Sequence, residues 1–162
     1  MIGIDTNILL CIFETEDDPA QSSRARKVIE EHAPVFLHDV VLAEFVWTCR
    51  NAFKPSREAI RRRLQAIADS TEFVVARPEV FARAVEAYGS QKSDFADWLV
   101  GLSNLHSGLE FTFTFDKSVA RRRAFGVIEA WEKDFTTHGE EVSRRLHYML
   151  ALLTVASIRK AG

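Results

Sequence analysis

The first residues of the chain, Met1-Ile2-Gly3-Ile4-Asp5-Thr6-Asn7, decide how the rest of the sequence is interpreted. Met1 to Asp5 is a short apolar run with β-branched residues, which predicts a strand. Asp5, Thr6 and Asn7 are residue types that begin helices, and the apolar stretch Ile8–Phe13 follows them. The opening therefore predicts a strand that ends in an acidic residue and passes directly into a helix.

The same alternation of short strands and helices continues along the chain. Further strands are predicted at Val35–Leu37, Phe73–Val75, Phe111–Phe115 and Val127–Glu129. Further helices are predicted at Pro19–Glu31 capped by Asp18, Val40–Ala52 capped by Asp39, Ser56–Ala68, Pro78–Tyr88 closed by Gly89, and Asp94–Ser107 capped by Ser93. This order predicts an α/β fold, a sandwich of a mainly parallel central sheet flanked by helices.

Length and composition predict one main domain with an appendage. The chain has 162 residues, of which 47% are hydrophobic and 27% charged, a globular mixture. The composition changes after Ala130, so we expect a domain over residues 1–130 and a helical extension over 131–162. Glu140–Ala161 carries an apolar stripe at helical spacing, which we expect to pack on the domain or on a second subunit.

The charge balance limits the kinds of partner. The net charge is −2, so a nucleic acid would have to be bound by a local basic patch. Arg61–Arg63 is interpreted as a solvated helix face, whereas Arg121, Arg122 and Arg123 follow Asp116 closely enough to contact RNA phosphates. No apolar stretch is long enough to span a membrane and no secretion signal is present, so we expect a cytoplasmic protein. Both cysteines are expected to be reduced, buried thiols.

Four acidic residues lie at the ends of apolar runs or inside them. Asp5 follows the first predicted strand and Asp116 the run Phe111–Phe115, while Glu44 and Asp97 lie within apolar helical stretches. A carboxylate in such surroundings is costly unless it is protonated, paired or bound to a cation. Any one of them is explained equally well as a capping or core group. Four together indicate a site at the carboxyl ends of the strands.

The residue types in this set indicate the metal that it would hold. Asp94 lies three residues before Asp97 and adds a carboxylate to the same helix face. Clustered acids repel one another, and a divalent cation removes that penalty. Oxygen ligands favour Mg²⁺ or Mn²⁺, and the histidines and cysteines have no zinc-binding spacing. Acid-only sites commonly perform phosphoryl chemistry.

Four segments, taken together, resemble the PIN-domain ribonucleases, and most of all the VapC toxins of bacterial VapBC toxin–antitoxin systems. They are Ile2–Asn7, Val41–Glu44, Asp94–Gly101 and Thr114–Lys117, in the order and spacing of that family. The resemblance covers about residues 1–130, and the extension over 131–162 departs from the pattern.

The resemblance implies a Mg²⁺- or Mn²⁺-dependent endoribonuclease. By position, the catalytic and metal-binding acids would be Asp5, Glu44, Asp97 and Asp116, and the supporting residues Thr6, Asn7, Asp94 and Thr114. The resemblance also implies a homodimer, a structured RNA substrate such as tRNA or ribosomal RNA, and inhibition by a VapB-type antitoxin.

Two other functions stay open at this point. One is a non-catalytic PIN-like module that binds RNA or a protein and keeps the acids for structure. The other is a PIN nuclease that acts in RNA maturation. Trp47 and Trp98 each neighbour a proposed acid, and both are interpreted as core side chains rather than platforms for stacking bases. His38 is interpreted as a hydrogen-bonded structural histidine.

Overall fold

A computed structural model describes residues 1–14, 18–110, 112–116, 119 and 125–127. These residues fall into two compact units, Met1–Thr112 and a second that begins at Phe113. The predicted extension over 131–162 and the triplet Arg121–Arg123 lie outside the described residues. Within the described part, none of the helices combines the length and the apolar character that crossing a membrane requires.

The first unit is built on parallel backbone pairing. Strand β1 (Val35–Leu37) pairs in parallel with β2 (Phe73–Val75). On the other edge of β1, Gly3 forms a parallel bridge with Phe36. The predicted first strand is reduced to this bridge because Asp5 already caps the following helix, which leaves only a short extended segment. The central position of β1 is consistent with the predicted parallel sheet.

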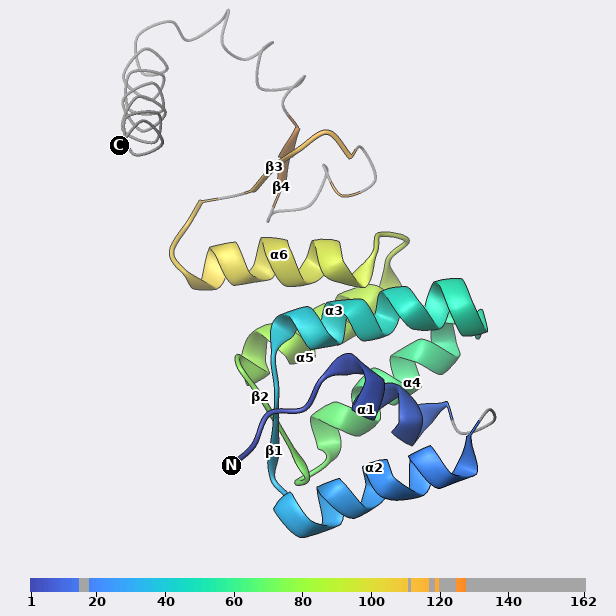
Figure 1. Cartoon of the computed structure of the whole chain (residues 1–162). Coiled ribbons are helices and arrows are strands. Elements are labelled where there is room, and N and C mark those ends of the chain that lie inside the picture. The colour runs from blue at the N-terminus through green and yellow to red at the C-terminus, as the bar shows by residue number, and fades with distance from the viewer. Residues whose placement is uncertain (15–17, 111, 117–118, 120–124, 128–162) are drawn as a thin grey trace, which may run out of the picture. The chain divides into compact units, whose positions relative to one another are not determined.

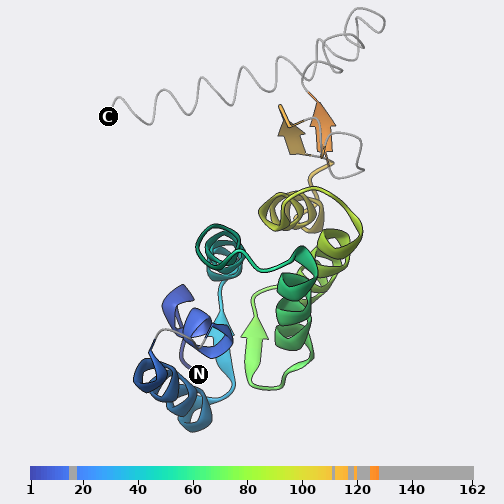
Figure 2. The same ribbon diagram turned by 90° about the vertical axis from the view of Figure 1, so that its right-hand side faces the viewer.

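Around these strands, the described residues of the first unit form α-helices (Figure 1). They are α1 (Thr6–Phe13), α2 (Pro19–His32), α3 (Asp39–Thr48), α4 (Arg57–Asp69), α5 (Pro78–Ser90) and α6 (Phe95–His106). Figure 2 shows α1 and α2 on one side of β1 and β2, and α4 and α5 on the other. Helix α3 contacts both α1 and α6. This layering confirms the predicted α/β class.

Helix α4 illustrates how the pattern of apolar residues places the core. Ile60, Leu64 and Ile67 recur at helical spacing, and each is at most 1% exposed. Burying an aliphatic side chain of this size contributes about 1.5–3 kcal/mol. The helix begins after Ser56, whose hydroxyl accepts a hydrogen bond from Ala59 N–H. The helix predicted over Ser56–Ala68 is therefore confirmed within one residue at each end.

Three predicted helix ends are wrong by one or two residues. His38, rather than Asp39, caps α3, with its Nδ1 accepting from Val40 N–H at 3.2 Å. Asp94, rather than Ser93, caps α6. Gly89 lies inside α5 instead of closing it. A Cβ at Gly89 would lie 2.4 Å from Cδ of Arg61, so any larger residue at this position would have to displace the Arg61 side chain.

The helix predicted to run to Ala52 changes its winding at Cys49. α3 ends at Thr48, and Cys49–Phe53 continue as a π-helix, after which Lys54 takes a left-handed conformation with φ of 52°. Cys49 is fully buried beside the ion pair between Glu14 and Arg63. The prediction that Arg61–Arg63 form a solvated face is therefore wrong for Arg63, whose side chain is largely buried in its ion pair with Glu14. Cys11, in contrast, is only partly buried.

The environment of Cys49 predicts a pH dependence of stability. Burial raises the pKa of its thiol from 9.0 to about 12, and the Glu14 carboxylate adds to the rise. Because the folded protein binds this proton more tightly than the unfolded chain does, the stabilisation is complete below about pH 9. We expect it to be lost as the pH rises from about 9 to 12.

Urea unfolding at several alkaline pH values measures this effect. The decline in free energy of unfolding should be smaller in Cys49→Ala than in the wild-type protein, and unchanged in the control Cys11→Ala. An identical decline in all three proteins would contradict the assignment to Cys49.

Strand β3 (Thr112–Thr114), which begins at the last residue of the first unit, pairs with β4 (Phe125–Val127). Both correspond to predicted strands, with shifted ends. Phe125, in β4, and Val119, between the two strands in sequence, are buried. Asp116 is exposed, and its backbone N–H donates to Thr114 Oγ1 at 3.0 Å.

Candidate functional site

Helices α1 and α3 bring together two of the predicted site residues, Thr6 and Glu44. The hydroxyl of Thr6, which is buried at the start of α1, donates to Glu44 Oε2 on α3 at 2.6 Å. Asp5 precedes Thr6 and caps α1, with Oδ1 accepting from Ile8 N–H at 3.1 Å. Asn7 lies exposed in the same first turn. The junction before α1 therefore carries the Asp5 carboxylate, and through Thr6 it orients the carboxylate of Glu44.

Both of these carboxylates face solvent. Asp5 and Glu44 are exposed, although the residues on either side of each include buried apolar side chains such as Ile4 and Phe45. The prediction of acids enclosed by apolar groups is therefore wrong for these two residues, because Asp5 is the extended cap that precedes α1 and Glu44 lies on the outer face of α3. Water relieves the cost of their charge, so neither needs a bound cation to be stable.

The Thr6–Glu44 hydrogen bond predicts an effect on activity. Thr6→Val should reduce a reaction that depends on Glu44 by about 10- to 100-fold, a typical loss when a group that orients a ligand is removed. Thr6→Ser keeps the donor and should stay close to the wild-type rate. Rates of RNA cleavage for the two variants provide the measurement, and equal rates would contradict an orienting role for this hydroxyl.

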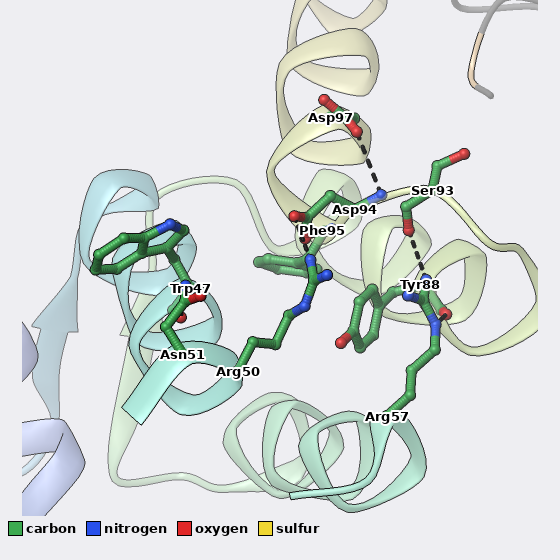
Figure 3. A network of polar contacts seen from close by, with 9 residues as sticks. All are labelled: Trp47, Arg50, Asn51, Arg57, Tyr88, Ser93, Asp94, Phe95 and Asp97. Atoms are coloured by element: carbon green, nitrogen blue, oxygen red, sulfur yellow. Dashed lines mark hydrogen bonds and ion pairs between the residues drawn. The ribbon is translucent and has the colours of Figure 1, made fainter. Parts of the chain in front are cut away.

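A second pair of acids surrounds the start of α6 (Figure 3). Asp94 Oδ1 accepts from Phe95 N–H at 2.7 Å, and Asp97 Oδ2 accepts from Asp94 N–H at 3.2 Å. The second of these bonds is one half of a capping box, whose other half is a hydrogen bond from the Asp97 backbone N–H to the Asp94 side chain. The other oxygen of Asp94 pairs with Arg50 of the π-helix. Asp94 is thus engaged in structure, and it positions the turn that carries Asp97.

Arg57 secures the same turn from a different side. Its guanidinium donates to the carbonyl of Tyr88 at 2.8 Å and to that of Ser93 at 2.5 Å. It also lies 3.7 Å from the centre of the Tyr88 ring, within the range of a cation–π contact. The connection between α5 and α6 is therefore held at both ends, which fixes where α6 begins. Sequence reasoning missed Arg50 and Arg57, because nothing in the nearby sequence indicates an ion pair or a hydrogen bond to residues more than 30 positions away.

The two tryptophans beside the acids differ in their environments. Trp98 is 6% exposed and belongs to the core, as predicted. Trp47 is 64% exposed, so its assignment to the core is wrong. Helical spacing gives the reason, since Trp47 lies three residues after the exposed Glu44 and shares its face. His38 is a structural, hydrogen-bonded histidine, as predicted.

The donor set fits a hard divalent cation in chemical type, because carboxylate oxygens are what such a cation binds. Asp5, Glu44 and Asp97 are the candidates in the first unit, and Asp116 in the second. Among the residues that the structure describes, no three His, Cys, Asp or Glu side chains form a group that could hold a metal ion. The described contacts join Thr6 with Glu44 and Asp94 with Asp97.

Comparison with known proteins identifies the family. A model of the PIN domain matches residues 2–125, well over half of the chain. The chain belongs to the PIN domain family. The matched region of this PIN domain contains all four predicted acids, and the resemblance found in the sequence is confirmed.

Structural comparison gives a more distant likeness for this PIN domain. The crystal structure of VapC20 from Mycobacterium tuberculosis, described as a sarcin-ricin loop cleaving toxin, is 20% identical in sequence with a TM-score of 0.36. The alignment covers 75% of this chain and 95% of the other. A comparison with curated proteins gives no match.

Proposed function

We propose that this PIN domain is a metal-dependent endoribonuclease that hydrolyses phosphodiester bonds in RNA. The observation that supports it most is the family match over residues 2–125, which contains Asp5, Glu44, Asp97 and Asp116. We further propose that the protein acts as a toxin that a VapB-type antitoxin neutralises, and that it forms a homodimer. Structured RNA, tRNA or ribosomal RNA, is the proposed substrate. These last points rest on the resemblance of the motifs to VapC toxins.

Each site residue has a defined part in this proposal. Asp5, Glu44, Asp97 and Asp116 would hold Mg²⁺ or Mn²⁺, which when bound lowers the pKa of water and neutralises charge on phosphoryl oxygens. Thr6 orients the Glu44 carboxylate through its hydroxyl hydrogen. The Asp94 cap and its pair with Arg50 hold the first turn of α6, and with it Asp97. A carboxylate among the four accepts the proton of the attacking water.

Purified full-length protein provides the test of this function. Incubation with total cellular RNA should give discrete fragments in Mg²⁺ or Mn²⁺, none in EDTA, and fragments again after the metal is restored. Mapping the 5′ ends of RNA after induction in cells would then locate the cleavage sites. Fragments that form equally well in EDTA would contradict the proposal, and so would intact RNA in every metal tested.

A further inference from the structure

One face of α3 is turned entirely toward solvent. Val40, Glu44 and Trp47 follow one another at intervals of four and three residues, and all three are exposed. The opposite face carries Leu42, Phe45 and Val46, which are at most 1% exposed. Trp47 therefore stands outside the core on a rigid element. It lies about 4.5 Å along the helix axis from Glu44.

The surroundings of Trp47 along the chain are polar rather than apolar. Asn51, one turn further on, donates from its side chain to the Trp47 carbonyl at 2.8 Å. Arg50 lies on the same turn as Asn51 and is about half exposed where it pairs with Asp94. Figure 3 shows the indole of Trp47 directed away from that ion pair. The exposed indole of Trp47 thus lies, along the helix, between the Glu44 carboxylate and a turn that carries the ion pair of Arg50 with Asp94.

We propose that Trp47 is a stacking platform for an unpaired nucleobase in a single-stranded loop of the structured RNA substrate, next to the phosphate cleaved at Glu44. This proposal rests on the proposed nuclease function and adds a binding residue to the same site. Aromatic rings bind bases of any sequence through their faces, and Arg side chains nearby bind the phosphates. The exposed indole lies beside Glu44 on the same face of α3. A base stacked on the indole would leave the Glu44 carboxylate in contact with water.

A second copy of the chain is the competing occupant of this face. A protein surface that covered Trp47 would also cover Glu44, one turn away and charged. The Thr6 hydroxyl donates a hydrogen bond to Glu44 but does not neutralise its charge, and burial of a carboxylate whose charge is not neutralised is costly. A base stacked on the indole avoids this cost, and we therefore favour RNA.

Binding of a fluorescently labelled, unstructured RNA oligonucleotide to full-length protein in EDTA tests this proposal without cleavage. Trp47→Leu should weaken binding by roughly 5- to 150-fold, the range for loss of one stacked base. Trp47→Phe keeps an aromatic face and should bind within a few-fold of the wild-type protein. Phe53→Ala removes another exposed aromatic side chain from the same helical segment and should have no effect. Thermal melting checks that each variant is folded.

Each other outcome is informative. Wild-type affinity in Trp47→Leu would overturn the proposal, as would no RNA binding by the wild-type protein. Light scattering without RNA tests whether a second copy of the chain covers this face instead. If Trp47→Leu has a different oligomeric state from the wild-type protein, the face belongs to a contact between copies and the proposal is overturned. If binding depends on Trp47 but no metal restores cleavage, the nuclease function fails and the stacking role stands.

Discussion

Asp97→Asn should lower the rate of RNA cleavage by on the order of 10²- to 10³-fold, the loss typical of removing one preorganised electrostatic group from an active site. The substitution removes a charge but keeps an acceptor oxygen. The hydrogen bond from Asp94 N–H and the capping box at the start of α6 should therefore survive. The fold should stay intact, so the loss would report on chemistry rather than on stability.

Asp18→Asn is the matched control for this variant. Asp18 caps α2, where its Oδ1 accepts from Ala20 N–H and Gln21 N–H, and asparagine is an equally good cap. Both variants should melt like the wild-type protein, and only Asp97→Asn should lose activity. Wild-type cleavage by a folded Asp97→Asn protein would remove Asp97 from the catalytic set.

Phe45→Ala should cost about 3–5 kcal/mol of folding free energy, the range for deleting a buried aromatic side chain. Phe45 is fully buried on the inner face of α3, and its ring lies 5.6 Å from that of Phe13 at the end of α1. Because these two helices carry Thr6 and Glu44, the cavity would also loosen the contact between those residues. We expect lower activity in the fraction of protein that stays folded.

Chemical denaturation measures the cost, with Phe53→Ala as the control. Phe53 is 42% exposed, and its truncation should change the free energy of unfolding by less than about 0.5 kcal/mol. Equal stability of the two variants would contradict the role of Phe45 in joining α1 to α3.

Much of the fold follows from local signals in the sequence. Pro19 after Asp18 begins α2 as predicted, because proline needs no hydrogen-bond acceptor at that position and the aspartate caps the next amides. The strands β1 and β2 lie at the predicted residues. The apolar spacing in α4 identified its buried face. In each case residues close in sequence determine the structure.

The errors occur where distant residues decide the outcome. Gly89 resembles a helix terminator, but its place opposite Arg61 depends on how α4 packs against α5. Arg63 resembles a surface cation, but Glu14 from another part of the chain pairs with it. The exposure of Trp47 could have been predicted from helical spacing. An inner face formed by Leu42, Phe45 and Val46 leaves position 47 on the outer face of the helix. Assigning Trp47 to the core from its hydrophobicity alone therefore gave the wrong prediction.

Titration calorimetry of the full-length protein with Mn²⁺ tests the central claim most directly, because it detects the metal site without RNA. The account predicts saturable binding by the wild-type protein at millimolar or lower Mn²⁺, weakened in Glu44→Gln and Asp97→Asn and unchanged in Asp18→Asn. No binding by the wild-type protein at millimolar Mn²⁺, or equal binding by all four proteins, would contradict it and favour a PIN domain that keeps its acids for structure.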